Sequence, residues 1–354
     1  MAAFLIATLA PLPLLFLAAL WGGVWGWVAL IWLTGFTALL DAILPRNWQN
    51  APLDRPFTAG VGLSVALGVA HLWLAVAAMR FLGGPGGAAG WAQVAPAALA
   101  YGVYFGQVSH PNAHELIHRP GRGLRRLGRL VYATMLFGHH ASAHPKVHHV
   151  WVASARDPNT AMLGEGFWRY LRRAWRGSFR EGFRIETYDL RRAGRPWWRH
   201  PYLGYGAIAA LCLALAAGFG GASGAALYLG ICAFAQVQIL LSDYVQHYGL
   251  ERAERADGRL EPVGPQHSWN APHMATGAMM LNAPRHSDHH LHPGRIYPGL
   301  QLDRQTMPIL PRSLPVMATV ALWPRWWRRV MDPRAQAIRD GALAEGRRHK
   351  EDGI

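Results

Sequence analysis

The stretch AYGVYFGQVSHPNAHELIHR, residues 100–119, joins an uncharged apolar run to a histidine motif. Its second half places His114 and His118 four residues apart, which puts both rings on one face of a helix. Fifteen of the 18 histidines lie in two windows, residues 110–149 and 247–292. Because imidazole is the commonest metal ligand in proteins, this clustering predicts a metal centre. Its place directly after an apolar run predicts that the centre lies at the mouth of a helical membrane bundle.

Long uncharged runs lie on both sides of this stretch. Asp, Glu, Lys and Arg are absent from residues 1–40, 56–79, 81–109 and 201–242. A helix needs about 20 apolar residues to cross the hydrocarbon core of a bilayer. The sequence therefore predicts an all-α integral membrane protein with about six transmembrane helices. We expect them at residues 3–20, 24–43, 60–81, 90–109, 203–219 and 224–243, paired as three hairpins with glycine-rich turns at 22–23, 83–87 and 220–224.

The alternative fold is a large soluble core with buried helices, but such helices seldom run this long without a charge. A cleaved signal peptide is disfavoured because the first run has no positive flank and a second apolar run follows at once. We expect residues 1–354 to form a single membrane-embedded domain, with the metal site carried by segments 110–200 and 244–310. The tail, residues 311–354, is expected to hold a short amphipathic helix with a frayed end.

Positive charge is distributed unevenly over this topology. The three hairpin turns contain no Lys or Arg, whereas residues 110–200 contain 17 Lys and Arg against 6 Asp and Glu, a net charge of +11. The positive-inside rule therefore predicts a multi-pass protein of the inner (plasma) membrane with both termini and the metal site in the cytoplasm. Nucleic acid is not an expected partner, because no zinc-finger, helix-turn-helix or RNA-binding signature is present. The excess arginine fits anionic lipid head groups or an acidic partner protein.

Nine histidines in four boxes have ligand-like spacing: His114, His118, His144, His148, His149, His247, His286, His289 and His290. The sequence His144-Pro145 is typical of a helix start, because proline fits the first helical position. From there His144 and His148 would share a face, and His149, rotated by about 100°, would point toward a second metal. Imidazole suits Fe, Zn, Cu and Ni, so ligand type alone does not choose the metal.

The first box, HExxH at residues 114–118, is also the signature of zinc metalloproteases, in which the Glu acts as general base. A catalytic zinc needs three protein ligands and an open position. Two metal ions that share nine imidazoles account better for the remaining boxes. A membrane zinc protease stays an alternative, and it predicts one zinc and no need for His286, His289 or His290.

Four carboxylates are candidates to orient the ligand rings and to spread the metal charge: Glu115, Asp157, Asp243 and Asp288. Glu115 and Asp288 are favoured because they lie inside the boxes. Six further histidines break the spacing and are expected in polar contacts rather than as ligands: His110, His139, His140, His267, His273 and His292. The two cysteines lie within predicted spans and lack the spacing of a metal or redox motif.

The order HELIHR, HPKVHH, DYVQHYG, RHSDHH resembles the integral-membrane alkane monooxygenases, which belong to the membrane fatty acid desaturase–hydroxylase superfamily. The pattern covers roughly residues 60–300. The resemblance implies a six-span fold with a non-haem di-iron site, two Fe held by the nine histidines named above. The chain departs from the family pattern at Ala143 and Val147 of the second box, at Asp243 and Gln246 around the HYG motif, and at Ala283-Pro284 before the last box.

By this resemblance we expect a monooxygenase that hydroxylates the terminal methyl group of an alkane to a primary alcohol with O₂ and two electrons. The chain has no haem-attachment motif, no cluster cysteines and no dinucleotide fingerprint, so a rubredoxin or ferredoxin donor with its reductase is an expected partner. Such donors are usually acidic, which fits the basic face. Hydroxylation of aromatic methyl groups, as in the xylene monooxygenases, and a fatty-acyl desaturase or hydroxylase stay alternatives.

Overall fold

The computed structural model describes residues 1–53, 57–83 and 90–351. Every regular element in these ranges is a helix, and the extended pairings there are two isolated bridges, Glu254 with Leu260 and Asn270 with Ile309. The predicted all-α fold is confirmed. The predicted turn at residues 83–87 lies almost wholly outside the described residues.

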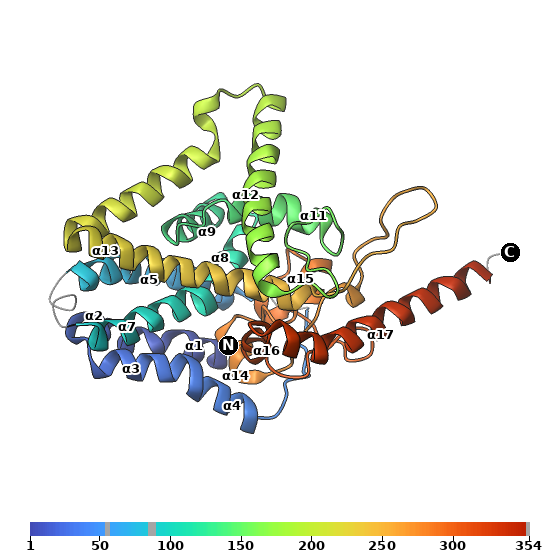
Figure 1. The fold of residues 1–354 in the computed structure, drawn as a ribbon, viewed down its shortest axis with the longest axis horizontal. Coiled ribbons are helices and arrows are strands. Elements are labelled where there is room, and N and C mark those ends of the chain that lie inside the picture. The colour runs from blue at the N-terminus through green and yellow to red at the C-terminus, as the bar shows by residue number, and fades with distance from the viewer. Residues whose placement is uncertain (54–56, 84–89, 352–354) are drawn as a thin grey trace.

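The apolar half of the chain forms a bundle of long helices (Figure 1). The first hairpin consists of α1 (Ala2–Leu9) and α2 (Pro11–Trp21), followed by α3 (Val24–Ile31), a π-helical segment (Trp32–Phe36) and α4 (Thr37–Ile43). Its turn is made by Gly22 and Gly23, which both have positive φ, at 61° and 55°. Next come α5 (Thr58–Gly83), α7 (Trp91–Tyr104), a π-helical segment (Phe105–Ser109) and α8 (His110–Ile117).

The last predicted hairpin is one element, α13, over Pro201–His247. A straight helix of 47 residues would be about 70 Å long, more than twice the thickness of a bilayer core. The helix is broken at Gly221, where φ is 62° and ψ is −156°, and its two halves meet at a sharp angle at the left of Figure 1. The junction of α2 and α3 lies at the same end of the bundle. The break therefore divides α13 where the sequence predicts a turn.

Apolar side chains point outward along these helices. Trp73 is 73% exposed and Leu211 is 58% exposed, although both lie within apolar helices. A helix that is apolar all round and not covered by protein is typical of a membrane span rather than of a soluble core. The exposed apolar surface therefore favours the membrane fold over the soluble alternative.

Four helices of the described residues are long and apolar enough to cross a membrane: Ala2–Trp21, Val24–Ile43, Thr58–Arg80 and Pro201–His247. The predicted span at residues 90–109 is helical as α7 and the π-helical segment after it, but it does not meet this criterion. The total of six crossings stays a prediction.

The polar half of the chain surrounds one end of this bundle. It contains α9 (Arg122–Thr134), α10 (His140–Ala143), a π-helical segment (His144–His148), α11 (His149–Trp151) and α12 (Phe167–Arg192). After α13 come α14 (Met274–Met279), α15 (His286–Leu291), α16 (Leu314–Ala321) and α17 (Pro324–Glu351).

The C-terminal tail is more ordered than the sequence predicts. Instead of one short helix it forms α16 and α17, and Trp327 of α17 is fully buried against Tyr244 and Tyr248 at the end of α13. The hydroxyl of Tyr248 donates to Asp332 at 2.5 Å. The tail was underestimated because its dense arginines mask the apolar stripe formed by Trp327, Met331 and Ala335.

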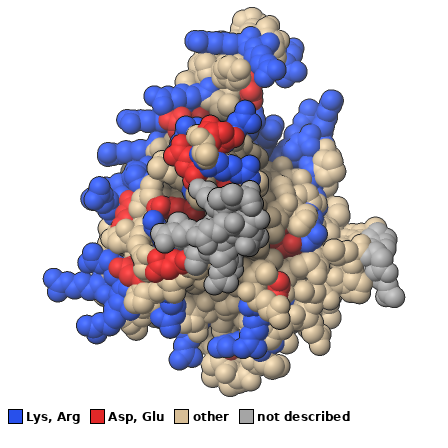
Figure 2. Space-filling view, turned by 90° about the vertical axis from the view of Figure 1, so that its right-hand side faces the viewer, with Lys and Arg blue, Asp and Glu red and all other residues tan. Residues whose placement is uncertain are grey.

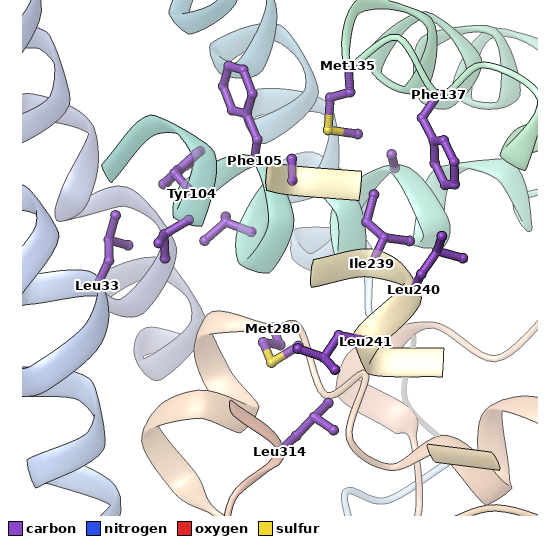
Figure 3. Packing of buried hydrophobic residues seen from close by; sticks show 14 of the residues in the cluster. Leu33, Tyr104, Phe105, Met135, Phe137, Ile239, Leu240, Leu241, Met280 and Leu314 are labelled. Carbon is purple, nitrogen blue, oxygen red and sulfur yellow. The ribbon is translucent and has the colours of Figure 1, made fainter. Parts of the chain in front are cut away.

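The core links the bundle to the polar half. In Figure 3, Ile239, Leu240 and Leu241 of α13 lie between the helix that carries Tyr104 and Phe105 on one side and Met280 and Leu314 on the other. These side chains belong to one cluster of buried residues. Such packing fixes the end of α13, and with it His247, at a set depth.

Candidate metal centre

The structure brings all nine box histidines together at one end of the bundle. His114, His118, His144, His149 and His289 form a first group, and His148, His247, His286 and His290 form a second. Within each group, one ring nitrogen of every residue lies within 4.8 Å of those of the others. Each group draws on at least three separate segments of the chain, so neither is a local product of one helix.

The histidines of the second box are shared between the two groups, which their spacing does not predict. His144 lies with His149 in the first group, whereas His148 lies in the second. The expected pairing of His144 with His148 is therefore wrong. The backbone N–H of His149 donates to the carbonyl of His144, which is a π-helical bond. A π-helical turn aligns residues five apart rather than four, and it brings the Nε2 atoms of His144 and His149 within 3.0 Å.

Ring nitrogens converge inside each group. In the first group, Nε2 of His144 lies 2.7 Å from Nε2 of His114, and Nε2 of His149 lies 3.1 Å from Nε2 of His289. In the second, Nε2 of His286 lies 3.0 Å from Nε2 of His247 and 3.1 Å from Nε2 of His290. Imidazoles that bind one metal at about 2.0–2.1 Å hold their nitrogens about 2.9–3.4 Å apart. The observed separations are close to this range.

The protonation chemistry of the cluster also suits a metal. A neutral imidazole donates from only one nitrogen, so hydrogen bonds among converging rings satisfy them poorly. Nε2 of His118 and Nε2 of His148 are buried and have no hydrogen-bond partner among the described residues. Burial lowers the pKa of His118 and of His286 to about 3, which keeps both rings neutral and able to ligate. The residues present therefore fit a bound cation.

Among the described residues, Asp157 is the one of the four candidate carboxylates that forms a hydrogen bond with a box histidine. Nδ1 of His148 donates to Oδ2 of Asp157 at 2.8 Å, because a carboxylate can only accept. Asp157 is completely buried and also accepts from the hydroxyl of Thr160 and the backbone N–H of Asn159. This bond leaves Nε2 of His148 facing the second group, an arrangement typical of metal-binding histidines.

Asn159 extends this hydrogen-bond network to Asp243, another of the four candidate carboxylates. Its side-chain amide donates to Asp243 at 2.7 Å, so Asp157 and Asp243 are joined through one residue. Neither Asn159 nor Thr160 lies in a histidine box or at a ligand-like spacing. Their only signal is that they follow Asp157 closely in a turn.

Glu115 and Asp288, which their positions in the boxes favoured, contact arginines rather than box histidines. Glu115 lies 3.3 Å from Arg119, and its burial raises the pKa of its carboxyl to about 7 in spite of this arginine. Asp288 accepts from Arg295, from the backbone N–H of Gln301 and from Nδ1 of His292. Both carboxylates thus brace the segments that carry the first and last boxes.

The six histidines outside the spacing lie outside both groups. His110 bonds to the hydroxyl of Tyr132, His139 to Ser178, His267 to Glu261 and His292 to Asp288. His140 differs, because both of its ring nitrogens are buried without a partner among the described residues.

The chain is similar to known proteins over most of its length. The family of fatty acid desaturases matches residues 89–320. An alkane 1-monooxygenase of Pseudomonas putida is 31% identical over 341 residues, which cover 92% of this chain and 81% of that protein. The chain belongs to the alkane 1-monooxygenase family, within the desaturase–hydroxylase superfamily. It is therefore an oxidoreductase of the monooxygenase type.

Two other relatives show the breadth of this similarity. An alkane 1-monooxygenase of Ectopseudomonas oleovorans is 32% identical over 334 residues, covering 89% of this chain and 79% of that protein. The hydroxylase component of a xylene/toluene monooxygenase of Pseudomonas putida is 26% identical over 328 residues, covering 89% and 84%.

Asp243 and Gln246, two of the residues at which this chain departs from the expected pattern, form hydrogen bonds near His247. Asp243 accepts from Asn159, and Gln246 donates to the carbonyl of Ala283 at 3.0 Å. Gln246 also accepts from Ser242. The altered residues therefore still connect the end of α13 to the segment before the last box.

Proposed function

We propose that this chain hydroxylates the terminal methyl group of an alkane, using two iron ions held by the nine box histidines. The single observation that carries this proposal is the division of those histidines into groups of five and four with converging ring nitrogens. Membership of the alkane 1-monooxygenase family supports iron as the metal and an alkane as the substrate.

The proposed reaction converts R–CH₃, O₂, two electrons and two protons into R–CH₂OH and water. Bound iron would supply the redox chemistry that activates O₂. The chain has no cofactor motif that could deliver electrons, so we propose a rubredoxin or ferredoxin, with its reductase, as the donor.

The protein's own residues would hold and orient the metals. His114, His118, His144, His149 and His289 would bind one ion, and His148, His247, His286 and His290 the other. Asp157 would fix the tautomer and the direction of His148, with Asp243 and Asn159 supporting it. Glu115 and Asp288 would steady the two boxes in which they lie. Seven of the nine box histidines are buried and His118 and His149 are half-buried, which would limit the access of bulk water to the reacting centre.

An apolar cavity of about 420 Å³ is the proposed substrate site. Leu33 of the second apolar helix, Phe234 and Leu241 of α13, Met280, and Leu314 of α16 line it, with a few polar groups such as Gln107. Leu241 points toward Met280 and Leu314 in Figure 3. Six residues of helix, about 9 Å, separate Leu241 from His247. An alkyl chain bound here would therefore lie close to the second histidine group.

Two alternatives use the same metal core. A xylene-type hydroxylase is less favoured because that relative is more distant, and a fatty-acyl desaturase or hydroxylase would need a polar head-group site beside the apolar cavity. A membrane zinc protease would use His114 and His118 but not the last box.

We also propose that the metal centre and both termini face the cytoplasm from the inner membrane. The support is the net charge of +11 on residues 110–200 against uncharged hairpin turns. A reporter enzyme that is active only outside the cytoplasm, inserted between Gly22 and Gly23, should be active.

The test of the proposed function is metal content and product formation by the purified chain with octane, reduced donor and O₂. Two irons per chain and 1-octanol are expected. His289→Ala and His247→Ala should each lower iron content and abolish product, while His349→Ala should change neither. One zinc per chain, or full activity of His289→Ala, would refute the proposal in favour of the protease. If the chain binds iron and makes no alcohol from octane, but does make product from xylene or an acyl chain, then the substrate is an aromatic or acyl compound rather than an alkane.

A further inference from the structure

Six arginines line one cleft beside the membrane bundle. Four of them, Arg122, Arg125, Arg126 and Arg129, recur three and four residues apart on one face of α9. The other two, Arg195 and Arg199, lie in the loop between α12 and α13. The cleft encloses about 580 Å³, and no Asp or Glu is among its lining residues.

The positive charge in this cleft is only partly compensated by the described residues of the protein. Among the described residues, the side chains of Arg122, Arg126, Arg129, Arg195 and Arg199 make no hydrogen bond or ion pair. Arg125 bonds only to the carbonyls of Arg119 and Pro120. The carboxylates of the adjoining hollow, Glu186 and Asp189, share Lys146 at 2.8 and 2.7 Å, so this trio leaves one net negative charge against the six arginines of the cleft. Clustered like charges repel each other, so an anionic ligand would stabilise this arrangement.

The cleft adjoins the start of an apolar helix that is long enough to cross a membrane. Its loop ends at His200, and the apolar helix α13 begins at the next residue. Trp197 and Trp198 in the same loop are exposed, Trp198 to 76%, and tryptophan is enriched at membrane–water interfaces. Figure 2 shows Lys and Arg side chains projecting around much of the outline of the face that it displays, with fewer Asp and Glu between them.

We propose that this cleft binds the phosphate of an anionic phospholipid head group from the leaflet next to the histidine clusters. Guanidinium groups bind phosphate oxygens in a bidentate manner, and basic pockets beside membrane helices suit head groups that carry two phosphates. Six arginines therefore favour a doubly charged head group, such as that of diphosphatidylglycerol, over a singly charged one. This inference does not depend on the substrate or on the metal of the proposed reaction.

The test is lipid retention by the purified full-length chain, measured by native mass spectrometry during titration with diphosphatidylglycerol, phosphatidylglycerol or phosphatidylcholine. Arg126→Gln/Arg129→Gln changes one wall of the cleft, and Arg195→Gln/Arg199→Gln changes the other. Each surface arginine contributes about 1 kcal/mol to the binding of anionic lipid, so each double variant should bind diphosphatidylglycerol about thirtyfold more weakly.

Arg176→Gln/Arg180→Gln is the matched control, because it removes two exposed arginines of α12 that do not line the cleft. It should change the affinity by less than twofold. Equal affinity in wild type and both cleft variants would overturn the proposal. Displacement of the lipid by inorganic phosphate at an equal concentration would show a site for free phosphate instead. If the cleft variants raise the KM for the reduced donor and leave lipid retention unchanged, the cleft is a protein-docking surface instead.

Discussion

Replacement of Asp157 by Asn should weaken metal binding at one histidine group and spare the other. Asp157 accepts three hydrogen bonds, from His148, Thr160 and the backbone of Asn159. His148 and Thr160 both bond to Oδ2, so an amide oxygen in that place keeps their bonds without the negative charge, and the new NH₂ group faces the backbone N–H of Asn159. His148 belongs only to the four-histidine group, which makes the effect site-selective.

Two independent energies agree on how much metal affinity the second group should lose. A hydrogen bond to a charged group contributes about 1.5–3 kcal/mol. Loss of a partner that orients a metal-binding histidine typically lowers metal affinity about 10–100-fold, which equals about 1.4–2.8 kcal/mol. We therefore expect the affinity of the second group for iron to fall by one to two orders of magnitude.

The assay is anaerobic titration of the metal-free protein with Fe²⁺, which counts tight equivalents. Wild type should bind two, and Asp157→Asn should bind one tightly and one weakly. Asp257→Asn is the control, since this carboxylate is exposed in the loop after α13. If Asp157→Asn still binds two Fe²⁺ equivalents tightly, or if both histidine groups lose affinity equally, the role assigned to Asp157 is refuted.

Three further outcomes are expected. Removal of metal by a chelator should lower the midpoint of thermal unfolding, because a ligand that binds only the folded state stabilises it, and re-addition of Fe²⁺ should restore it. Gly128→Ala should destabilise the chain by about 1–3 kcal/mol and weaken metal binding, because its Cβ would lie 2.9 Å from the carbonyl of Ala113 on α8. Gly123→Ala, on the same helix with open space around it, should instead be neutral or stabilising in a thermal melt. Leu241→Phe should shift product formation toward shorter alkanes by filling the cavity, whereas the exposed Leu229→Phe should not; an unchanged chain-length profile would exclude this cavity as the substrate site.

Periodicity and charge predicted most of the membrane bundle, because an uncharged apolar run has few structures open to it in a bilayer. The boxes likewise identified the nine histidines that the structure gathers. Spacing failed at His144, where the backbone N–H of His149 bonds to the carbonyl of His144 and closes a π-helical turn in place of an α-helical one. The choice between these turns is made by backbone bonds that residue spacing does not encode.

Asp157 was hard to rank for a related reason. It lies nine residues after His148, in a turn, so no helical period connects them. The favoured Glu115 and Asp288 share helices with box histidines, yet a carboxylate next to a ligand on a helix points about 100° away from it. Contacts that depend on chain reversal become visible only in three dimensions. The buried face of α17 was missed because arginines dominate its composition.

The last box supplies ligands to both histidine groups: His289 to the first, and His286 and His290 to the second. During synthesis neither group can be complete until the last box, residues 286–290, has left the ribosome, by which time all six predicted membrane spans have been made. Trp327 and Asp332, which brace the end of α13, emerge later still. Both metal ions would therefore bind late in synthesis. A chain that ends before the final box would still insert into the bilayer, but each histidine group would lack ligands, and its remaining ring nitrogens would be free to bind other metals.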